Sequence, residues 1–173
     1  MIAKMLGSVV ILSAGTIFGF YQALQYARRP RQIRQAIGMI QRLETEISYG
    51  FTPLPDAFAH ASSSFAEPYA SMLAEAADGL HAPDGKSTQE IWGQAVKRAW
   101  GRSSMKRNEL DILLQLGSTL GATDRIDQVK HMRLAISQLQ VEEDIARDEQ
   151  GRYEKMWRSL GVLMGALIVI LMY

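Results

Sequence analysis

One stretch of the 173-residue chain has residue types that could bind a phosphate, "GLHAPDGKS" at residues 79–87. Gly85, Lys86 and Ser87 repeat the end of the loop G-x-x-x-x-G-K-[ST], in which backbone amides hold phosphate groups and the lysine reaches the outer phosphates. The first glycine, Gly79, stands one residue too early. The segment before it has a helical pattern where the nucleotide fold requires a strand. The sequence therefore does not predict a nucleotide site here.

Metal chemistry is not predicted either. His60, His81 and His131 are scattered, with no H-E-x-x-H or paired E-x-x-H spacing. Asp78 shares a helix face with His81, and Asp127 with His131, but each pair offers too few ligands for a metal ion. The absence of cysteine excludes a thiolate site and a disulfide framework. We expect no metal and no cofactor, and we assign the histidines to surface or capping positions.

Glu44 and Glu46 are two carboxylates close together in the sequence, and such a pair could perform acid–base catalysis. Residues two apart on a helix point in different directions, so the pair does not predict a catalytic site, and no catalytic residue is proposed. With Tyr49 they lie near the end of a helix that a proline-rich turn follows. Such a place could be the docking face for a cytosolic partner protein. A solvent-exposed edge with no partner is the alternative.

The middle of the chain, residues 27–156, has the pattern of a helical bundle. Apolar residues recur at steps of three and four in six stretches, and no strand pattern is found. The predicted helices cover approximately residues 33–47, 54–65, 68–80, 87–99, 104–117 and 124–139. The fold class is therefore all-α, with one compact bundle of about six helices.

Helix-boundary residues support these limits. Ser87 and Glu90 have the spacing of a capping box, in which each side chain satisfies the other's backbone amide. Gly117 and Gly121 are expected to end one helix, and Asp124 is expected to cap the next. For these last three residues, which form a helix-turn motif, we favour a structural role.

The two ends of the chain are apolar. Residues 5–26 carry no charge and would cover about 33 Å as a helix, roughly the hydrocarbon thickness of a bilayer. A cleaved signal peptide is the rival interpretation, but no A-x-A site follows the run. Residues 159–173 would cover only about 22 Å, or about 27 Å with Met156 and Trp157 included. A buried core helix is the rival interpretation there, but residues 161–172 lack the polar face that a core helix normally shows.

We therefore predict three regions: an N-terminal transmembrane helix at 1–26, a cytosolic helical bundle at 27–156 and a C-terminal transmembrane helix at 157–173. Gly161 and Gly165 have the G-x-x-x-G spacing that permits close contact between membrane helices.

The charges are zoned, although the net charge is only +1 and no acidic residue precedes Glu44. Basic residues flank the inner side of both apolar ends, and arginine and lysine favour the cytoplasmic side of a span. The middle of the chain is thus expected in the cytoplasm, beside a lipid bilayer. Attraction to anionic lipid explains the arginines at residues 28–34 more simply than binding to nucleic acid does. The flanking basic residues are Arg28, Arg29, Arg31, Arg34, Arg152, Lys155 and Arg158.

Four sequence blocks, together with both apolar ends, resemble the stage III sporulation protein AB family of endospore-forming bacteria. The blocks are "RPRQIRQ" at 29–35, "LETEISYGFTPL" at 43–54, "LGSTLGATDRIDQVKHMRLA" at 116–135 and "EKMWRSLGVLMG" at 154–165. The resemblance runs from end to end of the chain.

The resemblance implies a mother-cell protein of the membrane around the forespore, part of the channel assembly that links the two cells. It implies a cytosolic part similar to the F domain of type II secretion platforms, with a secretion-type ATPase, stage III sporulation protein AA, and other membrane subunits as partners. Those platforms carry two F domains and this chain has room for one, so a homo-oligomer is possible. The resemblance supplies no catalytic residue.

Two other functions remain as alternatives. In the first, the chain is a soluble helical interaction protein whose apolar ends pack together as a core. In the second, it is a nucleotide-binding enzyme. This alternative is supported only by "DGKS" at residues 84–87.

Overall fold

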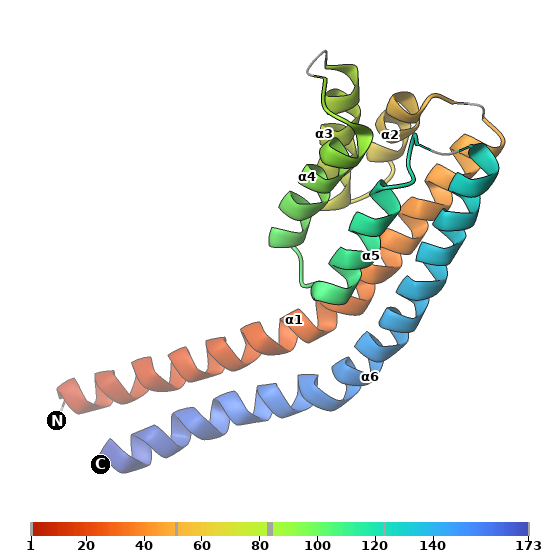
Figure 1. The fold of residues 1–173 in the computed structure, drawn as a ribbon. Coiled ribbons are helices and arrows are strands. Elements are labelled where there is room, and N and C mark those ends of the chain that lie inside the picture. The colour runs from red at the N-terminus through yellow and green to blue at the C-terminus, as the bar shows by residue number, and fades with distance from the viewer. Residues whose placement is uncertain (1, 51, 83–84, 123, 173) are drawn as a thin grey trace. The chain divides into compact units, whose positions relative to one another are not determined.

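The computed structural model describes residues 2–50, 52–82, 85–122 and 124–172. Within the helices it leaves undescribed the side chains of residues 2–12, 154, 158, 161, 162, 164, 165, 168, 169, 171 and 172. The described residues form six helices and no strand (Figure 1), which confirms the all-α prediction. The helices are α1 (Ile2–Ser48), α2 (Leu54–Ser62), α3 (Tyr69–His81), α4 (Thr88–Gly101), α5 (Arg107–Gly117) and α6 (Arg125–Met172).

The chain divides into two compact units. The terminal unit consists of Met1–Pro30 and Asp144–Tyr173, and the central unit consists of Arg31–Glu143. Helices α1 and α6 each contribute to both units. The sequence predicted that the transmembrane segments end at residue 26 and begin again at residue 157. These limits stay predictions.

The apolar ends continue directly into α1 and α6, and are not separate helices joined to a six-helix bundle. Pro30 lies inside α1, where it removes one backbone hydrogen bond without ending the helix. Toward the other end, residues 140–158 are rich in glutamate and arginine, which favour a helix, and contain no proline. Because neither junction contains a strong stop, each terminal run extends a neighbouring helix.

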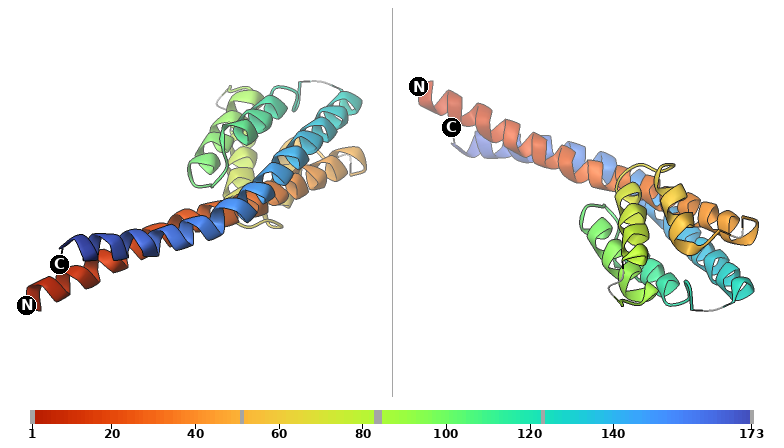
Figure 2. Two further views of the ribbon diagram at one scale, coloured as in Figure 1. Left: turned by 90° about the horizontal axis from the view of Figure 1, so that it is seen from below. Right: turned by 90° about the horizontal axis from the view of Figure 1, so that it is seen from above.

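In the terminal unit, α1 and α6 run side by side in opposite directions (Figures 1 and 2). The rings of Tyr26 and Tyr153 lie 5.5 Å apart, and those of Phe18 and Trp157 lie 6.5 Å apart, edge to face. Ala23 is buried, since its small side chain allows a close approach between the helices. A search of the described residues finds no helix that combines the length and the apolar character needed to cross a membrane.

The core of the central unit follows the apolar periodicity of the sequence. Ile33, Ile40 and Leu43 of α1 are fully buried, as predicted. Around them α2 packs on α3, α3 on α4, and α4 on α5. Phe58 of α2 stacks on Trp92 of α4 with ring centroids 5.4 Å apart. Each fully buried large apolar side chain contributes about 1.5–3 kcal/mol, so this face of α1 adds several kcal/mol to the stability of the unit.

Two of the predicted helix starts have the expected hydrogen bonds. Ser87 Oγ accepts from the Glu90 amide at 3.2 Å, and the Ser87 amide donates to Glu90 Oε2 at 3.0 Å, which completes a capping box. Asp124 Oδ1 accepts the amide of Asp127 at 2.8 Å, the geometry of an N-cap. Ile126, which the periodicity placed on the buried face of α6, is exposed instead.

Candidate functional site

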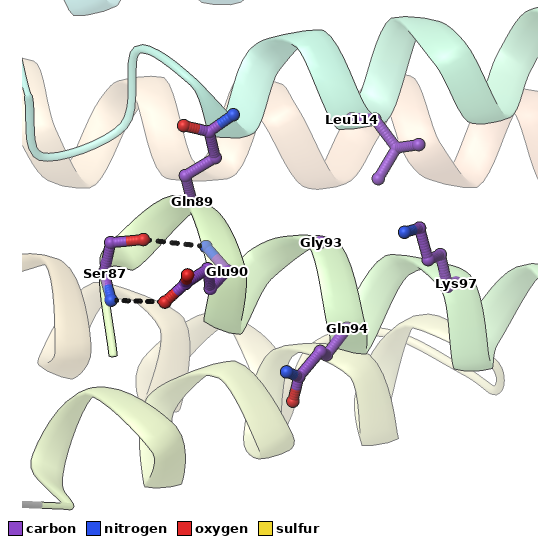
Figure 3. A pocket seen from close by; sticks show the side chains of 7 residues that line it. All are labelled: Ser87, Gln89, Glu90, Gly93, Gln94, Lys97 and Leu114. Atoms are coloured by element: carbon purple, nitrogen blue, oxygen red, sulfur yellow. Dashed lines mark hydrogen bonds between the residues drawn. The ribbon is translucent and has the colours of Figure 1, made fainter. Parts of the chain in front are cut away.

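The segment that resembles a phosphate loop borders a hollow of about 550 Å³ (Figure 3). Leu114 comes from α5, whereas the rest of the lining comes from α4 and the residue before it. The other lining residues are Ser87, Gln89, Glu90, Gly93, Gln94 and Lys97.

The polar groups nearest this hollow are engaged in holding α4. Ser87 Oγ and the Glu90 carboxylate are joined to each other's backbone amides by the capping box. No histidine is found among the described lining residues, so this lining offers no imidazole to activate the Ser87 hydroxyl. Gly79 lies within helix α3. The geometry is that of a helix start.

The histidines lie apart and close to single carboxylates. His60 Nδ1 is 4.0 Å from Glu46 Oε2, and His81 Nε2 is 3.8 Å from Asp56 Oδ1. His131 lines a small hollow between α5 and α6. No group of three or more potential metal ligands occurs in the part of the chain that the structure describes.

The predicted docking residues differ in their surroundings. Glu44 accepts a hydrogen bond from Arg133 Nε of α6 at 2.7 Å. Glu46 pairs with Arg42 at 2.8 Å and accepts from Thr52 Oγ1 at 3.2 Å. Both carboxylates thus hold neighbouring elements together. Tyr49, by contrast, is 83% exposed at the end of α1, so it is the predicted docking residue that a partner could reach most easily.

Gly117 permits a close contact inside the central unit. A Cβ atom at this position would lie 2.3 Å from Trp92 Cδ1 and 3.0 Å from Trp92 Cγ. Trp92 is fully buried, and its Nε1 donates to the Leu113 carbonyl at 2.6 Å. The ring therefore has a fixed place against the last turn of α5, where only glycine fits.

Gly121 and Asp124 shape the turn between α5 and α6. Gly121 has a φ angle of 73°, in the left-handed region that glycine adopts without strain. Its added Cβ would come within 3.1 Å of Thr88 Oγ1. Together with the Asp124 cap, this geometry gives the helix-turn motif a structural role.

The basic residues that flank the apolar ends fall into two groups. Arg29 is only 4% exposed, and its Nη1 pairs with Glu149 Oε2 at 2.5 Å within the terminal unit. Arg34 pairs with the buried carboxylate of Glu143 at 2.7 Å within the central unit. Exposed positions are held by Arg28, Arg31, Arg152 and Lys155, and also by Arg34 despite its ion pair. The side chain of Arg158 lies outside the described residues, as do Gly161 and Gly165 of the predicted G-x-x-x-G contact.

The terminal unit exposes large apolar side chains around much of its surface. Neighbouring positions such as Ile17, Phe18 and Phe20 point to different sides of α1, so the apolar surface is wider than one stripe. A water-exposed apolar surface of this kind marks a site that another molecule or a membrane covers. The exposed residues are Ile17, Phe18, Phe20, Tyr21, Leu24, Ile145, Met156, Leu160, Leu163, Leu167 and Ile170.

Sequence reasoning missed a groove between α5 and α6 in the central unit. A hollow of about 410 Å³ lies beside a smaller one, and Ile112 and Gln138 line both. Leu134 and Val141 of α6 add exposed apolar side chains to it. The spacing of Ile126, Leu134 and Val141, eight and seven residues apart, is the signal that could have revealed a second apolar face on α6.

The family model for stage III sporulation protein AB matches residues 4–173. The stage III sporulation protein AB of Bacillus subtilis (strain 168) is 41% identical over 169 residues, which cover 98% of each chain. A solved structure of a stage III sporulation protein AB is 38% identical, with a TM-score of 0.67, and the match covers 72% of this chain and 98% of the other.

Proposed function

This chain belongs to the stage III sporulation protein AB family, and on that premise we propose that it is a membrane-anchored platform subunit of a sporulation channel assembly. The terminal unit lies in the mother-cell membrane around the forespore. The central unit lies in the mother-cell cytoplasm, where it couples a secretion-type ATPase to the membrane subunits. The role is one of position and force transmission, without a chemical reaction or a cofactor.

The observation that carries the proposal is the apolar surface of the terminal unit. Phe18 is 57% exposed and Leu163 is 64% exposed. Removing apolar surface from water is worth about 25 cal/mol for each Å², so covering this hairpin with lipid tails is strongly favourable. The first predicted span also includes residues 5–12, whose side chains lie outside the described residues but are uncharged in the sequence.

The aromatic and basic residues of the same unit are ordered as a membrane boundary requires. Tyr26 lies between the first apolar run and Arg28, and its ring meets that of Tyr153, which follows Arg152, in the zone where tyrosine favours the headgroup region. Arg28 and Arg152 are exposed beside them and suit anionic lipid headgroups. The Arg29–Glu149 pair then joins the two helices at this level.

For the central unit, the all-helical bundle supports a single domain similar to the F domain of type II secretion platforms. We propose that the ATPase docks at the end of α1, around Tyr49, with Glu44 and Glu46 holding that end in place. Stage III sporulation protein AA is the proposed ATPase. Because the chain has one such unit, assembly with other membrane subunits or with further copies completes the platform.

Carbonate extraction of membranes from cells that produce the full chain tests the anchoring. The proposal predicts that the intact protein stays in the membrane pellet and enters solution only with detergent. Release of the intact protein by carbonate, together with a monodisperse protein in plain buffer, would instead favour a soluble helical protein whose ends pack on each other.

A pull-down of the purified ATPase with the detergent-solubilised full chain tests the partner. Tyr49→Ala is expected to weaken retention of the ATPase about tenfold, the loss that an exposed aromatic anchor commonly causes. The control is Gln94→Ala, an exposed position on α4. Equal retention by the Tyr49 variant and the control would exclude the α1 end as the docking face.

A further inference from the structure

The outward side of α6 carries a second apolar stripe. In the central unit the exposed large apolar side chains are Tyr49 at the end of α1 and Ile126, Leu134 and Val141 on α6, among the residues that the structure describes. Leu134 is 49% exposed and Val141 is 58% exposed. The buried Met132, Ala135 and Leu139 of the same helix face the core, so the stripe has no partner within the central unit.

The α5–α6 groove gives this stripe a binding shape. Val141 and Leu134 form the α6 side, Ile112 and the buried Leu116 form the α5 side, and Gln138 lies between them. The hollow of about 410 Å³ at the Val141 end can receive the large side chain of another protein. An apolar groove between two helices is the surface into which an amphipathic helix lays its apolar face.

The charged residues of the groove are acidic. Asp111 and Glu142 line it, and no lysine or arginine is found among its described lining residues. Glu142 Oε1 accepts from Asn108 Nδ2 at 3.0 Å, which holds this carboxylate at the groove edge. Asp111 pairs with Arg107, one helical turn earlier on α5 and outside the groove. A bound helix would therefore gain from basic residues beside its apolar face.

We propose that the α5–α6 groove binds a helix of a partner protein that is apolar on one face and flanked by lysine or arginine. The inference rests on the proposed function, which leaves the central unit in water beside other proteins of the assembly. A second copy of this chain fits less well. Its basic helix α4 carries Lys97 and Arg98, and Arg102 follows as the C-cap residue, but α4 exposes no large apolar side chain.

The test measures binding of two designed peptides by fluorescence anisotropy. Both are helical, have about 18 residues, or five turns, and carry leucine along one face. One is flanked by lysine and its twin by glutamate. The full chain is held in nanodiscs of zwitterionic phosphatidylcholine, with empty nanodiscs as the blank. The lysine peptide is expected to bind at least about tenfold more tightly than the glutamate peptide.

Three variants assign the binding to the groove. Val141→Asp should weaken the lysine peptide about tenfold, because it places a charge in the apolar face. Asp111→Lys should reduce the difference in affinity between the lysine peptide and the glutamate peptide. Ala59→Asp, which places the same charge at an exposed position on α2 outside the groove, should leave binding unchanged. Circular dichroism checks that each variant keeps its helical content.

Several results would overturn the proposal. They are equal binding of the two peptides, native affinity in the Val141 variant, an equal loss in the Ala59 variant, or self-association of the full chain that Val141→Asp abolishes, which would assign the groove to a second copy. Failure to enter nanodiscs would count against the membrane function alone, since the same peptide assay in plain buffer would still test the groove.

Discussion

Gly117 lies against the indole of Trp92 so closely that one added methyl group would come within 2.3 Å of Cδ1. The ring cannot easily move away. Its Nε1 donates to the Leu113 carbonyl, and its face stacks on Phe58. This contact joins α2, α4 and α5, so the position of the whole α2–α5 layer depends on a glycine near the end of α5.

Gly117→Ala is therefore expected to lower the free energy of unfolding by about 2–3 kcal/mol, as overpacking of a well-filled core does. Thermal unfolding of the full chain in detergent, followed by circular dichroism, measures the change. Gly101→Ala is the matched control, because no atom lies within 4 Å of its added Cβ. A Gly117 variant as stable as this control would show that the Trp92 ring adapts to the methyl group.

Asp124→Ala should remove the side-chain acceptor for the Asp127 amide at the start of α6. Loss of such a cap costs about 1 kcal/mol. Asp124→Asn retains an oxygen that can accept this bond and should recover most of the loss. Chemical unfolding of both variants tests this, and equal stabilities for alanine and asparagine would exclude the capping role.

Arg29 and Glu149 should show strong energetic coupling. Glu149→Leu leaves a nearly buried guanidinium without its carboxylate and is expected to cost about 2–3 kcal/mol, less than a fully buried pair because Glu149 is 25% exposed. The charge swap Arg29→Glu with Glu149→Arg should regain part of this loss. A double-mutant cycle from thermal unfolding in detergent measures the coupling, and strictly additive effects would show that the pair contributes nothing.

Tyr69 should make the central unit less stable in alkali. Burial, and secondarily the charge of Glu109, raises the pKa of Tyr69 well above its ordinary value near 10. Its hydroxyl donates to the Gln32 carbonyl at 2.8 Å, which requires the protonated form. The stabilisation is complete below about pH 10, where the tyrosine is also protonated in the unfolded chain, and falls as the pH rises above it.

Tyr69→Phe isolates this effect from the other groups that titrate in alkali. The difference in free energy of unfolding between the native chain and this variant should be constant from pH 7 to 9 and shrink above about pH 10, by up to about 1.4 kcal/mol per pH unit. A difference that stays constant to pH 11 would contradict the raised pKa.

The local features of the fold could be predicted from the sequence because their causes lie within a few residues. The capping box of Ser87 and Glu90 and the cap at Asp124 are examples. The periodicity of Ile33, Ile40 and Leu43 likewise identified the buried face of α1. Each of these signals is complete within one helix or turn.

The features that sequence reasoning missed depend on α1 and α6, which are far apart in the sequence. The burial of Arg29 requires Glu149, and the half-buried Glu44 requires Arg133. Neither partner can be identified before the register of the two helices is known. The continuity of the apolar ends with α1 and α6 was also missed: the sequence predicted one helix ending at residue 26 and another beginning near residue 33, whereas α1 runs through Pro30 between them. The exposed stripe of α6 was missed because this helix has apolar residues on two opposite faces, and only one of them is buried.

Cysteine accessibility tests most directly whether the terminal unit lies in lipid, because the native chain contains no cysteine. Leu163→Cys and Tyr49→Cys are compared in inside-out membrane vesicles with a charged maleimide that reacts only from water. If the terminal unit lies in lipid, position 49 is labelled rapidly and position 163 is labelled only after detergent is added. Equal labelling of both positions in intact vesicles would contradict this location in lipid.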